Sequence, residues 1–554
     1  MKNNTGLITD VAIGRRIAVS TAVSMLLIAL LTQLLSPPLL YLAALGAAIM
    51  PYTVGVVRPV VKRRIIAVDV DMLYIFLHMR SVATGKPPIS SLFKVISEDP
   101  RSYPRYYRIF KRVYLLGKEW GYSFSHAVRL IGEKIENLVL RNIFSRMSGV
   151  LAIGEDIESF LDIEYRTLIS EYINMYARTI NTARVFMGIY VTMMGSLIFV
   201  LVTFMLMAFF FGGNVSIIVS SYAGVGITLV FILILLYILV RKEPFEYHGD
   251  PELPRYRMLK IAGIASLSTS LVTAGIMAIS RTPTFNNIAI IMVIVGLILL
   301  PIGIIIKRVE GTISNIDEFF PVFIRSFGAH LATIPNMVKA LEPLLISQIG
   351  KLKKPLMRLY ARLSNGVDPQ IAWEVFAAES GSELTRRGVK IFIDTVEHGG
   401  DIEGIGALIS DHHNEMLRLR KQRLQVSKTF ESTLYIMHAA TIIILVFVTK
   451  LMIAFSTILS QLMAEAPTGL SDIFPFKALD APLLVNASLV LSILLTILNG
   501  MAVTRVSPGH SQSFYYYAAL LAIISGISIA ASSTLIDKVL EISLEATPTP
   551  PVGV

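Results

Sequence analysis

The sequence predicts an all-α, polytopic integral membrane protein with about nine transmembrane helices and two repeated cytoplasmic helix-bundle domains. Three observations predict this fold class. Of the 554 residues, 54% are hydrophobic and only 16% are charged, whereas a soluble domain carries about a quarter charged residues. Apolar windows long enough to cross a bilayer recur along the chain, and one short motif occurs twice at a spacing that the residues around it share.

The apolar windows each contain roughly 20 residues, the length that crosses about 30 Å of hydrocarbon. The first window is followed closely by the second and has a poor cleavage site, so it is expected to be a retained anchor and not a signal peptide. The windows are 17–35, 38–57, 185–211, 217–240, 261–279, 288–306, 434–459, 482–503 and 514–536.

A glycine-acid motif occurs twice, 245 residues apart. Gly154-Glu155-Asp156-Ile157-Glu158 is echoed by Gly399-Gly400-Asp401-Ile402-Glu403. The same offset pairs Gly121 with Gly366 and Tyr190 with Tyr435. A constant spacing over about 70 residues indicates a tandem repeat.

The windows and the repeat together predict the domain organisation. Each long polar stretch is expected to bury a core of its own, and apolar residues at helical spacing predict that both stretches are helix bundles. The expected parts are an N-terminal transmembrane hairpin (1–57), a first cytoplasmic domain (58–184), four transmembrane helices (185–306) with a cytoplasmic loop at 241–260, a second cytoplasmic domain (307–433), three transmembrane helices (434–536) and an external tail (537–554).

Lysine and arginine predict the orientation, because these residues are retained on the cytoplasmic side. Basic residues such as Arg63, Arg241 and Lys307 lie where the windows meet the polar parts. A multi-pass protein of the cell (cytoplasmic) membrane is expected, with a cytoplasmic N-terminus, both large domains cytoplasmic and the C-terminus external. Because both repeated domains are expected on the same side of the membrane, the repeat is parallel. Secondary transporters commonly have inverted repeats instead.

No motif for catalysis or cofactor binding stands out. The Gly-Lys pairs at Gly85, Gly117 and Gly350 lack the rest of a phosphate loop. Residues 411–415 include two histidines, but not at the spacing of a metal site, and are expected to form a solvated helix face. Lys450 is expected to snorkel to the membrane interface. No enzyme activity, metal or cofactor is therefore expected.

Basic stripes and the two glycine-acid turns are the candidate surfaces for an acidic cytoplasmic partner. Alternatively, the stripes are ordinary solvated faces or rest on anionic lipid, and the turns are ordinary helix caps. Nucleic acid is not expected at a surface tied to a membrane. The candidate residues are Arg101, Arg105, Arg108, Arg112, Lys351, Lys354, Arg358, Arg362, Arg418, Arg420, Lys421 and Arg423 in the stripes, and Gly154, Glu155, Asp156, Gly399, Gly400 and Asp401 in the turns.

These features resemble the type II secretion F family, the polytopic platform proteins of type IV pili, type II secretion systems and archaella. The resemblance rests on acidic helix starts at Asp71 and Glu318, on small-residue helices after Gly121 and Gly366, and on the glycine-acid turns. The large number of spans is more similar to the archaeal branch, which contains the archaellum platform (FlaJ or ArlJ type) and the platforms of adhesive pili.

The resemblance implies a non-enzymatic scaffold, and a homodimer is expected. Its implied partners are a hexameric cytoplasmic secretion ATPase, prepilin or archaellin-like subunits and membrane lipid. The second repeat departs from the pattern at Thr333-Ile334-Pro335, which lacks the glycine of Gly85-Lys86-Pro87-Pro88. A polytopic transporter or channel is the alternative class, although the windows hold few of the charged residues that ion coupling uses; an intramembrane enzyme has no supporting residues.

Overall fold

The structure is a computed structural model that describes residues 68–210, 215–240, 245–247, 254–280, 284–465 and 481–545. Regular structure in these ranges is helical, and an isolated antiparallel bridge joins Glu246 to Ser382. The prediction of an all-α fold is confirmed for this part of the chain. The first two apolar windows lie outside the described residues.

Two series of short helices each lead into a long helix. In the first series, α4 (Val70–Ala83), α5 (Ile89–Ser97), α6 (Tyr107–Lys118), α7 (Phe124–Gly132) and α8 (Leu138–Ile153) precede α9 (Ile157–Phe210). In the second, α12 (Phe285–Thr333), α13 (Met337–Ile346), η2 (Gly350–Leu352), α14 (Lys353–Ser364), α15 (Pro369–Ser380) and α16 (Glu383–Glu397) precede α17 (Ile402–Glu465). Helices α15, α16 and α17 each begin 245 residues after α7, α8 and α9.

The apolar helices are α10 (Val215–Leu239), α11 (Pro254–Ser280), α19 (Ala481–Val506) and α20 (Phe514–Glu545), together with parts of α9, α12 and α17. Within the described residues, five helices are long and apolar enough to cross a membrane. They are Ile157–Met207, Phe285–Thr333, Ile402–Ile458, Leu484–Val506 and Ser511–Lys538; Gly224–Leu239 is a shorter apolar helix. The chain is thus a multi-pass membrane protein.

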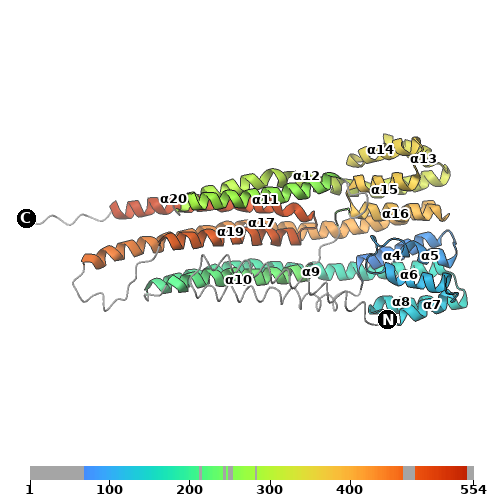
Figure 1. Cartoon of the computed structure of the whole chain (residues 1–554), viewed down its shortest axis with the longest axis horizontal. Helices are drawn as coiled ribbons and strands as arrows, with labels where there is room; N and C mark the ends of the chain where they lie inside the picture. Colours follow the sequence, from blue (N-terminus) through green and yellow to red (C-terminus); the bar gives the residue numbers. More distant parts are fainter. Residues whose placement is uncertain are drawn as a thin grey trace, which may run out of the picture.

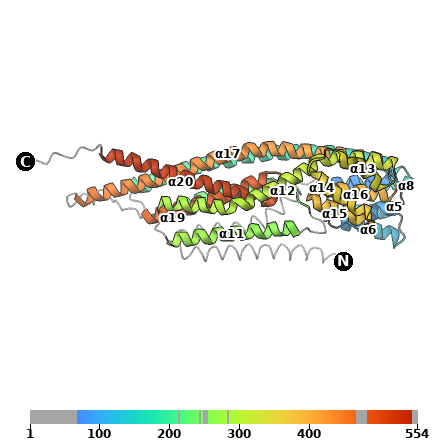
Figure 2. The ribbon, with the colours of Figure 1, turned by 90° about the horizontal axis from the view of Figure 1, so that it is seen from above.

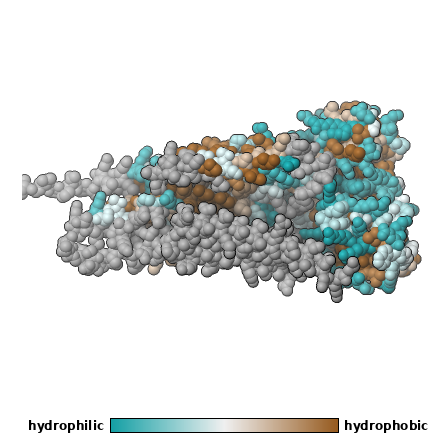
Figure 3. Space-filling view, in the orientation of Figure 1, coloured by the Kyte–Doolittle hydropathy of each residue, from teal (hydrophilic) through white to brown (hydrophobic). Residues whose placement is uncertain are grey.

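The molecule is elongated, with the short helices gathered at one end (Figures 1 and 2). Hydrophilic residues cover much of that end, whereas hydrophobic residues are visible along the long helices (Figure 3). Helices α12 and α20 lie so close that a Cβ on Gly303 would be 2.6 Å from the Tyr516 Cα, and one on Gly526 would be 2.7 Å from the Ala289 carbonyl oxygen. Glycine permits this close packing of apolar helices.

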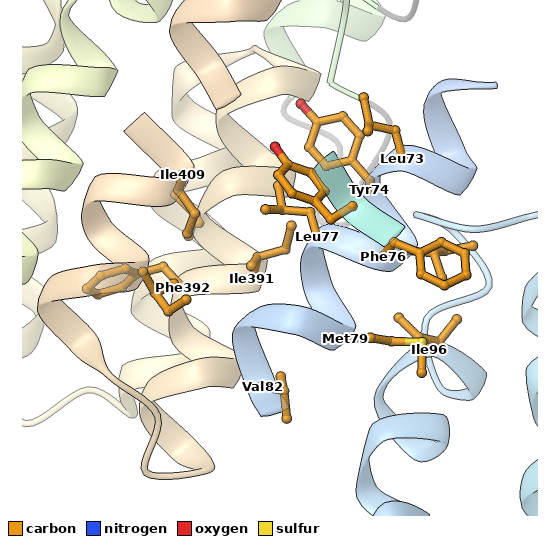
Figure 4. Packing of buried hydrophobic residues seen from close by; sticks show 14 of the residues in the cluster. Leu73, Tyr74, Phe76, Leu77, Met79, Val82, Ile96, Ile391, Phe392 and Ile409 are labelled. Atoms are coloured by element: carbon orange, nitrogen blue, oxygen red, sulfur yellow. The ribbon is translucent and has the colours of Figure 1, made fainter. Parts of the chain in front are cut away.

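The short helices of the two series share one hydrophobic core, which differs from the expectation of a separate core for each domain. Buried residues of α4, such as Leu77 and Phe76, belong to the same cluster as Ile391 and Phe392 of α16 and Ile409 of α17 (Figure 4). Helix α4 is buried along almost its whole length, because α16 and α17 cover the face that its own series leaves open. The two bundles therefore form one packed unit.

Two connections between apolar helices lie at the same end as the bundles. Between α10 and α11, the amide of Tyr247 donates to the Gly381 carbonyl oxygen at 2.9 Å, and the Phe245 carbonyl oxygen accepts from the amide of Glu383 at 3.3 Å. Between α19 and α20, the amide of His510 donates to Glu310 of α12 at 3.1 Å. The long helices alternate in direction accordingly, away from the bundles and back.

Candidate functional site at the interface between the bundles

A buried cluster of charged side chains joins α4 of the first bundle to α16 of the second. Arg387 of α16 donates to Asp71 of α4 at 2.8 Å and to Glu383, one turn earlier on α16, at 2.9 Å. Its guanidinium also lies over the ring of Tyr74, 4.9 Å from the centroid. The side chain of Arg387 is only 6% exposed, so its charge depends on these partners and ties the bundles together.

The two carboxylates of this cluster respond differently to burial. Burial raises the pKa of Glu383, but hydrogen bonds and attraction from Arg386 and Arg387 outweigh it and lower that pKa to about 2. Burial prevails at Asp71, whose pKa is raised although Arg387 opposes the shift. Arg386 extends the cluster into the first bundle, because it donates to the Ser102 hydroxyl at 2.9 Å.

A second charged group links the same two helices nearer their C-terminal ends. His78 Nε2 lies 2.9 Å from the carboxylate of Asp394, and His78 Nδ1 lies 3.0 Å from the Tyr103 hydroxyl. Lys390 donates to Asp394 at 2.8 Å. Burial raises the pKa of Asp394, but the contacts with His78 and Lys390 prevail and lower it. Asp394 therefore stays ionised between the bundles.

His412 and His413 are buried on α17, so the prediction of a solvated helix face for 411–415 is wrong at these two positions. His412 Nδ1 lies 2.9 Å from the Tyr165 hydroxyl, and His413 Nε2 lies 3.0 Å from the Asp317 carbonyl oxygen. Burial lowers the pKa of His412 to about 3 and that of His413 to about 4. Both rings are neutral contacts between α17 and neighbouring helices.

Arg420, one of the sequence-predicted docking residues, belongs to the interior of this interface. It donates to the Asp317 carboxylate at 2.7 Å, and Asp317 is fully buried. Thr385 of α16 donates to the other oxygen of Asp317 at 2.9 Å. The guanidinium of Arg420 also lies 5.0 Å from the ring centroid of Phe245. Arg420 thus stabilises the junction of α12, α16 and α17.

The first glycine-acid turn is exposed and caps two helices. Gly154 ends α8 with a φ of 80°, a left-handed conformation that suits glycine. Asp156 accepts hydrogen bonds from the amide and hydroxyl of Ser159, which lower its pKa. Glu155 is exposed beside them. The capping interpretation holds here, and the turn also remains accessible.

The second glycine-acid turn contacts the first bundle. Gly399 has a φ of 69°, and Asp401 caps α17 by accepting from the amide of Gly404 at 3.1 Å. The backbone amide of Asp401 also donates to the Thr84 hydroxyl oxygen of the first bundle at 3.0 Å. A Cβ on Gly400 would lie 2.7 Å from that same hydroxyl oxygen. This turn is therefore an internal contact between the bundles.

Replacing Gly85 by valine should lower the free energy of unfolding by about 1–3 kcal/mol, the usual cost of overpacking. A Cβ at this position would lie 2.2 Å from the His398 carbonyl oxygen, so the end of α4 and the second turn would have to separate. Gly149 has open space around its Cβ position, and Gly149→Val is the matched control for lost glycine. Urea unfolding of the two variants measures the difference, and equal midpoints would contradict the close contact.

The members of the first basic stripe, Arg101 to Arg112, differ in their surroundings: some contact buried groups and others lie on the surface. Arg101 and Arg105 precede α6, so the helical spacing holds only for Arg108 and Arg112. Arg105 donates to the buried carboxylate of Asp69 at 2.9 Å. Arg108 and Arg112 are exposed, and they are the members of this stripe best placed to meet another protein.

The second stripe lies on the outer face of α14 and of the turn before it. Lys354 and Arg358 are exposed, whereas Arg362 is 25% exposed. Both arginines contact Glu379 of α15. Lys351 lies in η2, where its amide donates to Asn315 at 2.8 Å. The predicted opposite apolar face is confirmed, since four leucines there are buried: Leu352, Leu356, Leu359 and Leu363.

The third cluster also divides. Arg418 and Lys421 are exposed and contact Glu415 and Glu318. Arg423 is buried and donates to the carbonyl oxygens of Val506 and Arg505 at 2.9 and 3.0 Å. These carbonyls end α19, where a cation is favourable, so Arg423 attaches α17 to an apolar helix.

A polar network lies among the apolar helices, which sequence reasoning did not identify. Tyr190 of α9 donates to the Asn499 side chain at 2.7 Å, and Asn499 donates to His438 Nδ1 at 2.9 Å. His438 Nε2 lies 2.7 Å from the Ser525 hydroxyl of α20. The network joins α9, α17, α19 and α20. Lys450, expected to snorkel, donates to Asp537 at 2.6 Å.

The charged side chains between the bundles form contacts between helices of this chain. Among the described residues, no group of three histidine, aspartate or glutamate side chains could hold a metal ion. The charged side chains between the bundles are instead matched to one another. Sequence reasoning missed Glu383 and Arg387, although an acid followed at i+3 and i+4 by two arginines was an available signal.

The fold and this interface define a multi-pass membrane protein in which two joined helix bundles continue into long apolar helices. Residues 323–453, which run from α12 into the apolar part of α17, match the family described as Type II secretion system (T2SS), protein F. This segment of the chain is similar to that family.

The chain is also similar to two curated archaeal proteins, each named Flagella accessory protein J. The protein from Methanocaldococcus jannaschii is 25% identical over 357 residues, covering 62% of this chain and 63% of the relative. The protein from Methanococcus voltae is 23% identical over 336 residues, covering 59% and 60%. The matches thus span less than two thirds of the length of these relatives. No solved structure matches the chain.

Proposed function

We propose that this protein is the integral membrane platform on which a type IV pilus-like filament, an archaellum or an archaeal pilus, is assembled. It couples a cytoplasmic secretion ATPase to the insertion of prepilin-like subunits, and does no catalysis itself. The observation that carries the proposal is the family match from 323 to 453, which covers the path from the second bundle into a candidate span.

Continuous helices support the coupling. Helix α17 contains 64 residues and α9 contains 54, and a helix of 64 residues is about 96 Å long. Each begins at a glycine-acid turn in the bundles and continues into apolar sequence. Because the bundles share one core, a force applied to either bundle would move several long helices together.

The proposal includes nine transmembrane helices, two repeated cytoplasmic bundles, the domain boundaries of the sequence analysis and an external C-terminus. The 245-residue correspondence between helix starts supports a repeat. The bundles and the 245–247 and 507–513 connections lie at one end, and Lys307, Arg423 and Arg505 lie beside them, which supports a cytoplasmic bundle end. A homodimer beneath a hexameric ATPase completes the proposal.

For docking of the ATPase, the proposed surface is the exposed part of the predicted residues. Arg105, Arg358, Arg362, Arg420 and Arg423 contact carboxylates or carbonyls of this chain, so they are less available to a partner protein. The proposed docking residues are Arg108 and Arg112 of α6, Lys354 of α14, and the exposed turn Gly154-Glu155-Asp156.

Co-purification tests the proposal. The solubilised full chain is incubated with each secretion ATPase of the same genome, and ATP turnover is measured with and without the chain. Recovery of an ATPase whose turnover rises in the complex supports the platform. Recovery of none, together with solute uptake into proteoliposomes, would favour a transporter instead.

Reversing the charge of Arg108 and Arg112 together should weaken ATPase binding at least about tenfold at low salt, where exposed charges are least screened. The physical reason is that an acidic partner would be repelled by the new glutamates. Arg166→Glu is the control, because Arg166 is an exposed arginine, 73%, of another surface of the first bundle. Equal affinity of the double variant and the wild type would exclude this part of the surface.

A further inference from the structure

A cavity of about 390 Å³ lies where the bundles meet the apolar helices. Its walls include Ala183 and Met187 of α9, Val240 beside the end of α10, and Val506 at the end of α19. Val506 is also the last residue of the candidate span Leu484–Val506. The cavity therefore lies at the boundary between polar and apolar parts of the molecule, and its volume is in the range of small-molecule sites.

The lining of the cavity has two chemical characters. One part is apolar and includes Met175, Ile180, Ala183, Met187 and Val426. The other part contains four arginines, Arg101, Arg105, Arg387 and Arg423, and three acids, Asp69, Asp71 and Glu383. An apolar wall beside a charged one fits an amphiphile better than a fully polar solute.

The acids of the lining are already matched by arginines. Asp69 accepts from Arg105 at 2.9 Å, and both Asp71 and Glu383 accept from Arg387. With four arginines against three acids, the charged part of the lining carries a positive formal balance. An occupant with negative charge is therefore favoured over a cation.

The guanidinium of Arg387 is a second, independent indication of a negatively charged occupant. Its side chain is 6% exposed, yet the buried Nη1 has no hydrogen-bond partner within the described protein. A guanidinium does not lose its proton, and a buried donor without an acceptor costs about 1–3 kcal/mol. Arg387 is one of the residues that line the cavity, and an occupant whose acceptor group reached Nη1 would remove that cost.

We propose that this cavity binds an anionic membrane phospholipid. Its phosphate headgroup accepts hydrogen bonds from Arg387 and faces Arg101 and Arg105, and one hydrocarbon chain lies along the apolar wall of α9. Basic pockets between helices at a membrane boundary are suited to such headgroups. Free inorganic phosphate would leave the apolar wall in contact with water, so the lipid is the favoured source of the phosphate.

Occupancy of this site would connect the bilayer to the contact between the bundles. Arg387 is both part of the lining and the residue that joins Asp71 of α4 to Glu383 of α16. A lipid phosphate would add a third anionic partner to this guanidinium. The contact between the bundles would then be more stable in a membrane that contains anionic lipid.

Native mass spectrometry of the detergent-solubilised full chain tests the site, with phosphatidylglycerol as the probe. The wild type should retain one tightly bound phosphatidylglycerol. Ala183→Phe fills the apolar part and Arg101→Gln removes a charge from an exposed position of the lining; each should weaken this binding at least about tenfold. The matched controls, Asn181→Phe on the exposed side of α9 and Arg108→Gln on α6, should bind within about twofold of the wild type.

Several results would overturn the proposal. Retention of phosphatidylglycerol by both Ala183→Phe and Arg101→Gln at wild-type affinity would place the lipid elsewhere. Equal affinity for phosphatidylcholine would exclude a selective anionic site, and competition by inorganic phosphate at equal affinity would identify a soluble anion as the ligand. No retention by the wild type would exclude a tight site. None of these outcomes depends on whether the protein binds an ATPase.

Discussion

Replacing Arg387 by methionine should lower the free energy of unfolding by about 3–5 kcal/mol, the cost of leaving a buried charge without its partner. The substitution removes the guanidinium that Asp71 and Glu383 share across the bundle interface. Glu383 keeps Arg386, so the loss falls mainly on Asp71. Urea unfolding followed by the fluorescence of Trp373, which is 1% exposed in the second bundle, measures the change.

Three comparisons separate this effect from a general loss of a charged contact. Arg166→Met removes an exposed partner of Asp162 and should cost no more than about 1 kcal/mol. Arg387→Lys keeps the charge but not the two-pronged geometry, and should lie between the wild type and Arg387→Met. Asp71→Asn added to Arg387→Met should recover part of the stability. An Arg387→Met variant as stable as Arg166→Met would show that this cluster does not hold the bundles together.

Local features of the fold could be predicted from the sequence, because they depend on neighbouring residues. Gly154 and Gly399 end their helices in the left-handed region, and Asp156 and Asp401 cap the helices that follow. The alternation of leucine and basic residues on α14 correctly separated its buried and exposed faces. Each of these predictions needs only one turn of helix and its capping chemistry.

Contacts between the bundles could not be predicted in the same way. A periodic pattern says that His412 and His413 share α17 with exposed neighbours, but not that α4, α9 and α12 cover them. In the sequence, Arg420 and Arg423 belong to one basic cluster. In the structure, Arg420 contacts Asp317 and Arg423 contacts the end of α19. Long-range packing decides whether a basic residue is a surface or an interior residue.

The packing also explains why the first series has a glycine, Gly85, at the turn after α4, whereas the second series has none at the corresponding turn after α12. Gly85 is needed because the second glycine-acid turn lies against it, with His398 closest. Thr333 and Ile334, at the corresponding end of α12, are exposed, so no glycine is required there. The second glycine-acid turn thus contacts the first bundle through Gly400 and Asp401, which lie beside Thr84, whereas Gly154, Glu155 and Asp156 of the first turn are all exposed. This asymmetry places the accessible turn on the first bundle.

Acidification from pH 7 to pH 5 should lower the free energy of unfolding by about 4 kcal/mol through His412 and His413. Their pKa values are about 3 and 4 in the folded chain against about 6.5 in the unfolded chain. Both residues lie outside the apolar stretch 434–459 of α17. Unfolding therefore takes up a proton at each ring below pH 6.5. The contribution of the two histidines to the free energy of unfolding is fully present above that pH. As the pH falls toward 4, each histidine lowers the free energy of unfolding by about 1.4 kcal/mol per pH unit.

The surroundings of the two rings support the sign of this effect. Tyr74 and Tyr165 pack on His412, and Arg387 disfavours its protonation. The Asp317 carboxylate, 3.9 Å from His413 Nε2, favours protonation, but burial and Arg420 prevail. Glu383 and Asp394, whose pKa values are lowered, weaken the fold only as the pH falls below about 4. Asp71, whose pKa is raised, acts in the opposite direction, because its protonation favours the folded chain as the pH falls. The two histidines therefore account for the loss of stability between pH 6.5 and 4.

His412→Phe keeps the packing against Tyr74 and removes one titrating group, so it should reduce the loss between pH 7 and pH 5 by about half. Trp373 fluorescence during urea unfolding at each pH measures the slope. His126→Phe is the control, since His126 lies on the surface of α7, beside Tyr122 and Arg129, and should leave the slope unchanged. If His412→Phe retains the full pH dependence, burial of His412 does not contribute to the acid stability of the joined bundles.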